Sequence, residues 1–150
     1  MKLVICIAAC IVSGVLGSLW TAPKLQPWYA NLAKPAWTPP NWLFGPVWSA
    51  LYLMMAIAAW LVWRTANGFT LPLKLFVFQL LLNVAWSGIF FGLRSPAAGL
   101  IDIALLWLSI LATAIAFWQA VPVAGWLLLP YLIWVGYASA LNFSIWRLNS

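Results

Sequence analysis

Apolar residues along this 150-residue chain gather into five long blocks that are nearly free of charge. The blocks are Leu3 to Trp20, Phe44 to Trp63, Leu73 to Leu93, Ala97 to Trp118 and Val123 to Trp146. Each is close to the ~20 residues that a helix needs to cross a bilayer. A transmembrane barrel would instead show short segments of alternating polarity. The pattern predicts an all-α integral membrane protein, with one five-helix domain over residues 1–150.

The connection from Thr21 to Leu43 is long and dense in proline and tryptophan, whereas the other connections are short. Prolines fix φ and remove amide donors, so we expect a stiff, non-helical segment up to Phe44. Its largest aromatic residues are Trp28, Tyr29, Trp37 and Trp42. Such rings favour the boundary of water and lipid or an apolar ligand. We therefore predict that this loop forms a lid over one end of the bundle.

Prolines mark the expected starts of the later helices, because the first turn of a helix has no use for an amide donor. They are Pro46, Pro72, Pro96 and Pro122. Pro130 lies inside the last block and is expected to bend that helix one turn earlier. The first block resembles a secretory signal with a lipoprotein-like cleavage box before Cys10. Because the apolar run continues to Trp20, we favour a retained first helix.

Composition and charge agree with a membrane protein. Hydrophobic residues make up 67% of the chain and charged ones 5%, whereas a soluble domain has about a quarter charged residues. The basic residues flank the apolar blocks and are Lys2, Lys24, Lys34, Arg64, Lys74, Arg94 and Arg147. Cations at helix ends match lipid phosphates, so no nucleic-acid partner is predicted. The topology divides them four to three between the faces, which does not fix the orientation.

Few residues offer metal or acid–base chemistry. Cys6 and Cys10 share one helix face and are expected to be buried as small hydrophobic groups. The chain has no histidine, so no metal site and no required cofactor are predicted. The single acid, Asp102, lies early in the fourth block. It has two interpretations, a structural role near the helix N-terminus or a proton relay.

Polar and aromatic residues form stripes on three of the predicted helices. The third helix carries Gln79, Asn83, Trp86 and Phe90 on one stripe. These amides indicate either hydrogen bonds between helices or the wall of a ligand pocket. The other two faces contain Trp48, Tyr52 and Met55, and Tyr131, Trp134, Ala138, Leu141 and Asn142. Three such stripes beneath an aromatic lid favour a cavity for a flat molecule.

Glycine spacing suggests close helix contacts. Gly88 and Gly92 form a GxxxG pair, and Gly14 with Ser18 forms a second pair of small residues. Such pairs let helix backbones approach each other. We interpret Gly88 and Gly92 as a dimer face, with helix packing inside one chain as the alternative.

Three motifs together resemble the translocator protein family, also called the tryptophan-rich sensory protein or peripheral benzodiazepine receptor family. They are the run Lys34 to Tyr52, the segment Gln79 to Trp86 leading into Gly92, and the segment Pro130 to Trp134 leading into Asn142 and Arg147. The resemblance covers nearly the whole chain. It implies a five-helix bundle, a homodimer, and a cavity closed by the first loop. It also implies a bacterial envelope or mitochondrial outer membrane.

The resemblance further implies a receptor or sensor that binds porphyrins such as protoporphyrin IX, haem, or drug-like and sterol-like ligands, and that transports them. The ligand-binding wall would include Tyr29, Gln79, Asn83, Trp86, Ala138 and Leu141 by motif position, beside Trp48, Tyr52, Phe90 and Trp134. An alternative is an enzyme that degrades porphyrin with light and oxygen, using Trp48 and Trp134. A second alternative is a small proton-coupled exporter, which would need an acid such as Asp102 at substrate depth.

Two details favour a tetrapyrrole over a sterol. The family's sterol motif is reduced here to Leu141, Phe143 and Arg147, with phenylalanine in place of tyrosine. Iron-free protoporphyrin needs no axial ligand, which suits a chain without histidine. Cations expected on the lid face are candidates to pair with its propionates. They are Lys24, Lys34, Arg94 and Arg147.

Overall fold

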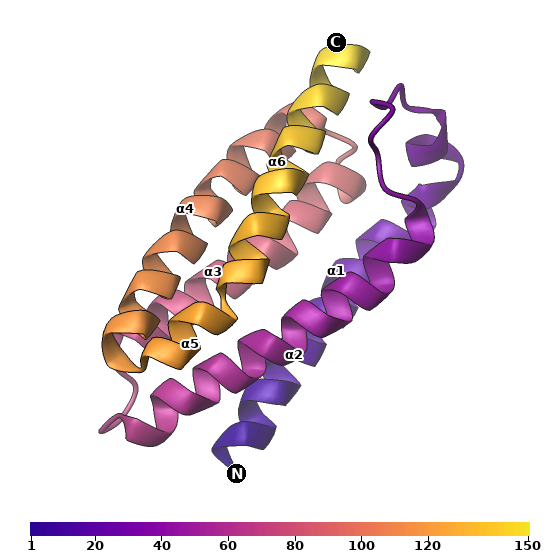
Figure 1. Ribbon diagram of the computed structural model, residues 1–150. Coiled ribbons are helices and arrows are strands. Elements are labelled where there is room, and N and C mark those ends of the chain that lie inside the picture. Colours follow the sequence, from indigo (N-terminus) through magenta and orange to yellow (C-terminus); the bar gives the residue numbers. More distant parts are fainter.

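Five long apolar helical segments run the length of the molecule, as the hydropathy pattern predicts (Figure 1). The computed structural model describes residues 1–150. Its elements in chain order are α1 (Lys2–Lys24), the π-helical turn η1 (Leu25–Tyr29), α2 (Asn41–Thr65), α3 (Leu71–Ser87), the π-helical turn η2 (Gly88–Gly92), α4 (Pro96–Ala120), α5 (Pro122–Leu127) and α6 (Leu129–Asn149). The first span joins α1 to η1, the third joins α3 to η2, and the fifth joins α5 to α6. The predicted all-α membrane bundle is confirmed.

The two ends of the bundle differ in what they contain (Figure 1). The N-terminus and the connection between α2 and α3 lie at one end, which we call the N-terminal end. The C-terminus and residues 30–40 lie at the other, the C-terminal end. The element bounds place the cations as the topology predicts. Those at the C-terminal end are Lys24, Lys34, Arg94 and Arg147, and those at the N-terminal end are Lys2, Arg64 and Lys74.

The first connection is shorter than predicted. Although Pro23 removes one amide donor, α1 continues past Trp20 to Lys24, and the Leu25 amide still donates to the Thr21 carbonyl. The chain then kinks at Gln26, whose extended backbone is typical of a residue before proline. Only residues 30–40 separate η1 from α2. The expectation of a non-helical segment from Thr21 onward is therefore wrong for its first third.

The second helix begins earlier than predicted. It starts at Asn41, directly after the extended Pro40, rather than at Phe44. Pro46 consequently lies inside α2 and not in its first turn. By contrast, Pro96 and Pro122 are the first residues of α4 and α5, and Pro72 is the second residue of α3. The positions of the prolines therefore predicted three of the four helix starts closely.

The last span is interrupted where Pro130 predicts it. The helix breaks at Leu128, between α5 and α6, because the proline ring cannot donate to the preceding turn. Just before the break, α5 packs tightly against the end of α4. A Cβ atom at Gly125 would lie 2.4 Å from the Trp118 Cβ atom, so only glycine fits there. The bend lets α6 lie along α4, where the Trp107 indole donates to the Leu132 carbonyl.

Candidate functional site

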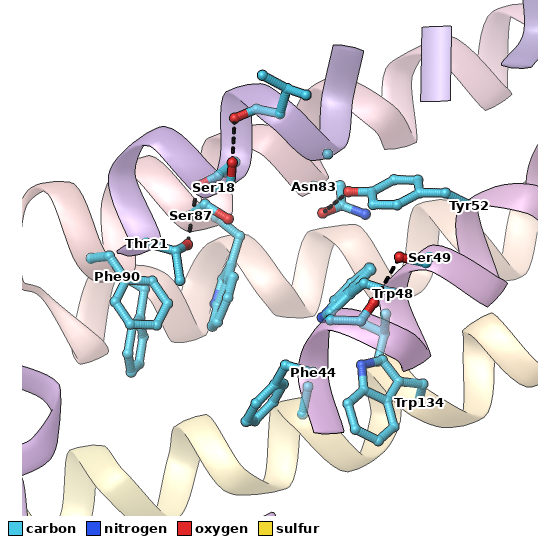
Figure 2. A pocket seen from close by; sticks show the side chains of 18 of the residues that line it. Ser18, Thr21, Phe44, Trp48, Ser49, Tyr52, Asn83, Ser87, Phe90 and Trp134 are labelled. Carbon is cyan, nitrogen blue, oxygen red and sulfur yellow. Dashed lines mark hydrogen bonds between the residues drawn. The ribbon is translucent and has the colours of Figure 1, made fainter. Parts of the chain in front are cut away.

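A large cavity lies inside the half of the bundle nearer the C-terminal end. Its volume is about 740 Å³, and residues from α1, η1, α2, α3, η2, α4 and α6 line it. Figure 2 shows side chains around it, with Trp48, Trp134, Phe44 and Tyr52 contributed by α2 and α6. Sites for drug-sized ligands commonly measure about 300–1,000 Å³ and are mostly apolar. The cavity has the size and lining of a ligand site.

Aromatic rings form much of the cavity wall. Trp48 packs against Tyr52 with ring centroids 5.6 Å apart, and Phe44 meets Trp134 edge-on at 5.9 Å. On the other side, Trp86 stacks on Phe90 at 4.9 Å. Flat faces of this kind suit a planar apolar molecule.

A buried chain of hydrogen bonds supports one side of the cavity. The Tyr131 hydroxyl donates to the Gln79 amide oxygen at 2.8 Å and accepts from the Asn83 amide nitrogen at 2.7 Å. The Asn83 oxygen in turn accepts from the Tyr52 hydroxyl at 3.4 Å. Asn83 and Tyr52 line the cavity, whereas Gln79 and Tyr131 lie behind its wall. The chain therefore fixes the polar groups that a ligand meets.

A second polar link joins three helices beside the cavity. The Trp86 indole donates to the Asn142 amide oxygen at 2.9 Å, and the Asn142 amide nitrogen donates to the Pro96 carbonyl at 2.8 Å. These bonds connect α3, α6 and the start of α4. Trp134 differs, because its indole nitrogen is buried without an acceptor in the protein. It is an unpaired donor in the cavity wall.

Comparison with known proteins assigns the chain to a family. Residues 6–147 match the TspO/MBR family. The chain belongs to this family. A tryptophan-rich protein TspO of Chlorobaculum tepidum is 47% identical over 99% of this chain and 96% of that protein. The translocator protein of Homo sapiens is 45% identical over 81% of this chain and 75% of that protein. A tryptophan-rich sensory protein of Cereibacter sphaeroides is 40% identical over 95% of this chain.

Membership of the TspO/MBR family makes this an integral membrane protein, in agreement with its five apolar spans. The names of the relatives support a role as a membrane sensor or receptor. The predicted resemblance is thus confirmed, and it rests on nearly the whole chain.

The structure places almost every predicted ligand-binding residue of this TspO/MBR chain on one cavity. The residues that line it are Tyr29, Trp48, Tyr52, Asn83, Trp86, Phe90, Trp134, Ala138 and Leu141. Gln79 is the exception, since it bonds Tyr131 and lies near the Met55 sulfur instead of lining the cavity. Of the two interpretations for the amides, a hydrogen bond between helices describes Gln79, and both describe Asn83, which bonds Tyr131 and Tyr52 and also lines the cavity.

None of the four cations predicted to pair with propionates lines the cavity. Arg94 and Arg147 are exposed, and Lys24 is half-buried. The Lys34 ammonium donates to the main-chain carbonyls of Tyr29, Ala30 and Leu32. Lys34 therefore stabilises the backbone of the first connection. To pair with a ligand, its ammonium group would have to give up these hydrogen bonds.

The remnant of the sterol motif does not form one surface. Leu141 is buried in the cavity wall, whereas Phe143 is exposed on the outside of α6. The Arg147 guanidinium lies 5.9 Å from the Phe143 ring centroid, on that same outer side. The three residues therefore face two different environments.

Intrachain packing accounts for the glycine pair. A Cβ atom at Gly92 would lie 3.1 Å from the Trp20 ring, and one at Gly88 would lie 3.6 Å from it. The pair thus gives α1 close access to η2, which is the alternative that the sequence left open. The homodimer stays a prediction.

Asp102 is buried in the second turn of α4, and one of its carboxylate oxygens has no partner. The dipole of a helix acts mainly within its first turn, so the predicted dipole contact is weak here. Asp102 also does not line the cavity. The cavity wall therefore contains no acid that could relay protons at the depth of a bound substrate.

The sequence reasoning missed the contribution of the first helix. Cys10, Gly14 and Ser18 of α1 line the cavity, although the predicted walls came from other helices. A Cβ atom at Gly14 would lie 3.2 Å from the Tyr52 ring. The spacing of Gly14 and Ser18 was the available signal, since it marks a helix face with little side-chain volume.

Proposed function

We propose that this protein is a membrane receptor or sensor that binds a tetrapyrrole, with protoporphyrin IX as the first candidate, and hands it on. The observation that carries the proposal is the 740 Å³ cavity walled by Trp48, Trp86, Phe90 and Trp134. These rings offer stacking faces for a planar macrocycle. The apolar lining also fits drug-like and sterol-like ligands, which are competitors in the test below.

The placement of charge supports an orientation for such a ligand. No lysine, arginine or acid lines the cavity, so the macrocycle fits inside and its propionates are better placed outside. The C-terminal end carries Lys24, Arg94 and Arg147, and no acid lies near it except the buried Asp102. The propionates are therefore expected to point toward this end.

The indole N–H of Trp134 is buried without a partner, so it does not lie on the surface that a ligand meets, and Trp134 contributes to the cavity wall through its ring. Trp134 also contacts Tyr137, with ring centroids 5.7 Å apart. Exchange of the indole for a phenyl ring keeps much of this packing and removes the donor.

Residues 30–40 act as the lid in this proposal. Two contacts tie them to α6. The Asn149 amide makes a reciprocal pair of hydrogen bonds with the Ala33 backbone at 2.9 and 3.0 Å, which we call the Asn149 clasp. The Tyr137 hydroxyl donates to the Trp37 carbonyl, and their rings meet edge-on. Beneath them, Tyr29 belongs to a buried cluster with η2 and α6.

The first prediction tests binding and separates it from catalysis. Protoporphyrin IX, titrated in the dark into the detergent-solubilised protein, is expected to quench tryptophan fluorescence saturably. The complex is then illuminated while the porphyrin spectrum is followed. Trp48→Phe and Trp134→Phe are expected to bind within about threefold of wild type, because phenylalanine keeps most of the apolar contact.

The outcomes of this test divide the candidate functions. A stable spectrum under light would leave a receptor or carrier. Light-dependent loss of the spectrum that is slower in both variants would support the enzyme, since indoles can donate an electron to an excited porphyrin. Absence of saturable quenching would reject the tetrapyrrole, and a sterol titration would then take its place.

The second prediction concerns the lid. Asn149→Ala removes both bonds of the Asn149 clasp at a residue that does not itself line the cavity. Two exposed hydrogen bonds contribute about 1–2 kcal/mol in total, so the porphyrin dissociation rate is expected to rise about fivefold or more. Stopped-flow displacement measures this rate. Ser150→Ala, one residue further on and exposed, is the matched control. Equal rates in all three proteins would contradict the lid.

A further inference from the structure

A second hollow lies near the N-terminal end, away from the large cavity and between α1, α2 and α3. Its volume is about 100 Å³, and all its lining residues are hydrophobic. We call it the N-terminal groove. Its floor includes Cys6, Leu73 and Phe76, which are buried, while Ile5 and Val77 on its rim are 46% and 41% exposed. The rim residues lie on membrane-spanning helices, so the groove opens toward the bilayer.

Three cations lie at the same end of the bundle as this groove, and one of them contacts a residue of its lining. The Lys2 ammonium donates to the Trp63 carbonyl at 3.0 Å and lies 5.5 Å from the centroid of the Trp63 ring, which lines the groove. Arg64 and Lys74 lie at this same end of α2 and α3, and the Arg64 guanidinium lies 4.8 Å from the centroid of the Trp60 ring. No acid lies at this end, because Asp102 stands near the opposite end of α4. The apolar groove thus lies beside Lys2, at an end of the bundle that carries only positive side-chain charges.

We propose that the N-terminal groove binds one acyl chain of an anionic glycerophospholipid, whose phosphate meets Lys2 at the end of the bundle that also carries Arg64 and Lys74. The floor offers no hydrogen-bond partner, so only an apolar segment can occupy it. The groove is far smaller than the ~300–1,000 Å³ typical of sites for compact ligands, which favours a flexible chain over fused rings. The cations favour a negative headgroup, each by about fivefold near a membrane surface.

Native mass spectrometry of the full-length protein tests this site. The protein is released from micelles that contain equal amounts of dioleoylphosphatidylglycerol and dioleoylphosphatidylcholine. Wild type is expected to retain one phosphatidylglycerol with a preference of about tenfold or more, given Lys2 and the other cations at this end of the bundle. Val77→Trp fills the groove from its rim and is expected to remove that bound lipid. Leu81→Trp is the matched control, because Leu81 lies one turn further along α3, exposed and outside the groove.

The headgroup is tested separately from the chain. Lys2→Gln combined with Arg64→Gln and Lys74→Gln is expected to bring the preference for phosphatidylglycerol close to one, while Arg147→Gln at the opposite end leaves it unchanged. Ile5→Trp fills the groove from its other rim and serves as the second blocking variant if Val77→Trp does not fold. Equal retention of the two lipids by wild type, or full retention by a folded blocking variant, would overturn the proposal. A higher retention of cholesterol added to the same micelles would also overturn it.

Discussion

Ala138→Phe is expected to weaken protoporphyrin IX binding by about a hundredfold, close to 2.7 kcal/mol. Ala138 lines the cavity one helical turn after Trp134, and its small side chain leaves open the space beside that indole. A phenyl ring there would occupy the face on which the macrocycle is proposed to stack. The protein interior does not compress to make room, so ligand and phenyl ring would compete for the same volume. The tryptophan-quenching titration measures the change in Kd.

Ala140→Phe provides the matched control for this prediction. Ala140 lies on the same helix, but its side chain is exposed on the outer face. The same substitution there adds the same ring to the lipid side and should leave the Kd within about twofold, because no ligand contact changes. Similar affinities for both variants would mean that the porphyrin does not occupy the space beside Trp134.

Tyr131→Phe is expected to lower the free energy of unfolding by about 2 kcal/mol, with a fall in the apparent melting temperature of about 4–8 °C. The hydroxyl is fully buried and bonds both Gln79 and Asn83. Its removal leaves a buried oxygen and a buried N–H group unpaired. Because Asn83 lines the cavity, porphyrin binding is expected to weaken as well. Thermal unfolding in detergent, followed by circular dichroism, measures the loss.

A double substitution distinguishes the hydrogen bond from a general packing effect. Gln79→Met replaces the amide with an apolar chain of similar length. Combined with Tyr131→Phe, it removes both partners, so the double variant is expected to lose less stability than the sum of the single variants. Tyr137→Phe is the control, because its hydroxyl makes an exposed hydrogen bond, to the Trp37 carbonyl. Strict additivity in the double variant would contradict the proposed chain of bonds.

The sequence predicted the membrane spans well because a single physical requirement determines them. A helix that crosses hydrocarbon must be long and apolar and must satisfy its own backbone, and five blocks meet this requirement. The break at Leu128 followed in the same way from Pro130, whose ring cannot donate a hydrogen bond. The end of the first helix was placed too early, at Trp20. Pro23 removes only one backbone hydrogen bond, while tertiary contacts keep the surrounding turns helical.

Helical periodicity predicted the candidate site only in part, because it shows which residues share a helix face. Spacing of three and four residues showed that Asn83, Trp86 and Phe90 share a face, and all three line the cavity. Gln79 belongs to the same stripe, but residues four apart differ by about 40° around a helix axis. That difference was enough to turn Gln79 toward Tyr131 and away from the cavity. Periodicity cannot show which neighbour a given part of a face meets.

The sequence by itself determined the class of protein, the number of spans and the residues that share each helix face, because hydropathy and helical spacing are local properties. Only the tertiary structure decided that α1 forms part of the wall, that Gln79 lies behind it, and that Gly88 and Gly92 face Trp20 of the same chain. These outcomes depend on how each helix is rotated about its axis. That rotation is set by the packing of side chains far apart in the sequence, which no local pattern records.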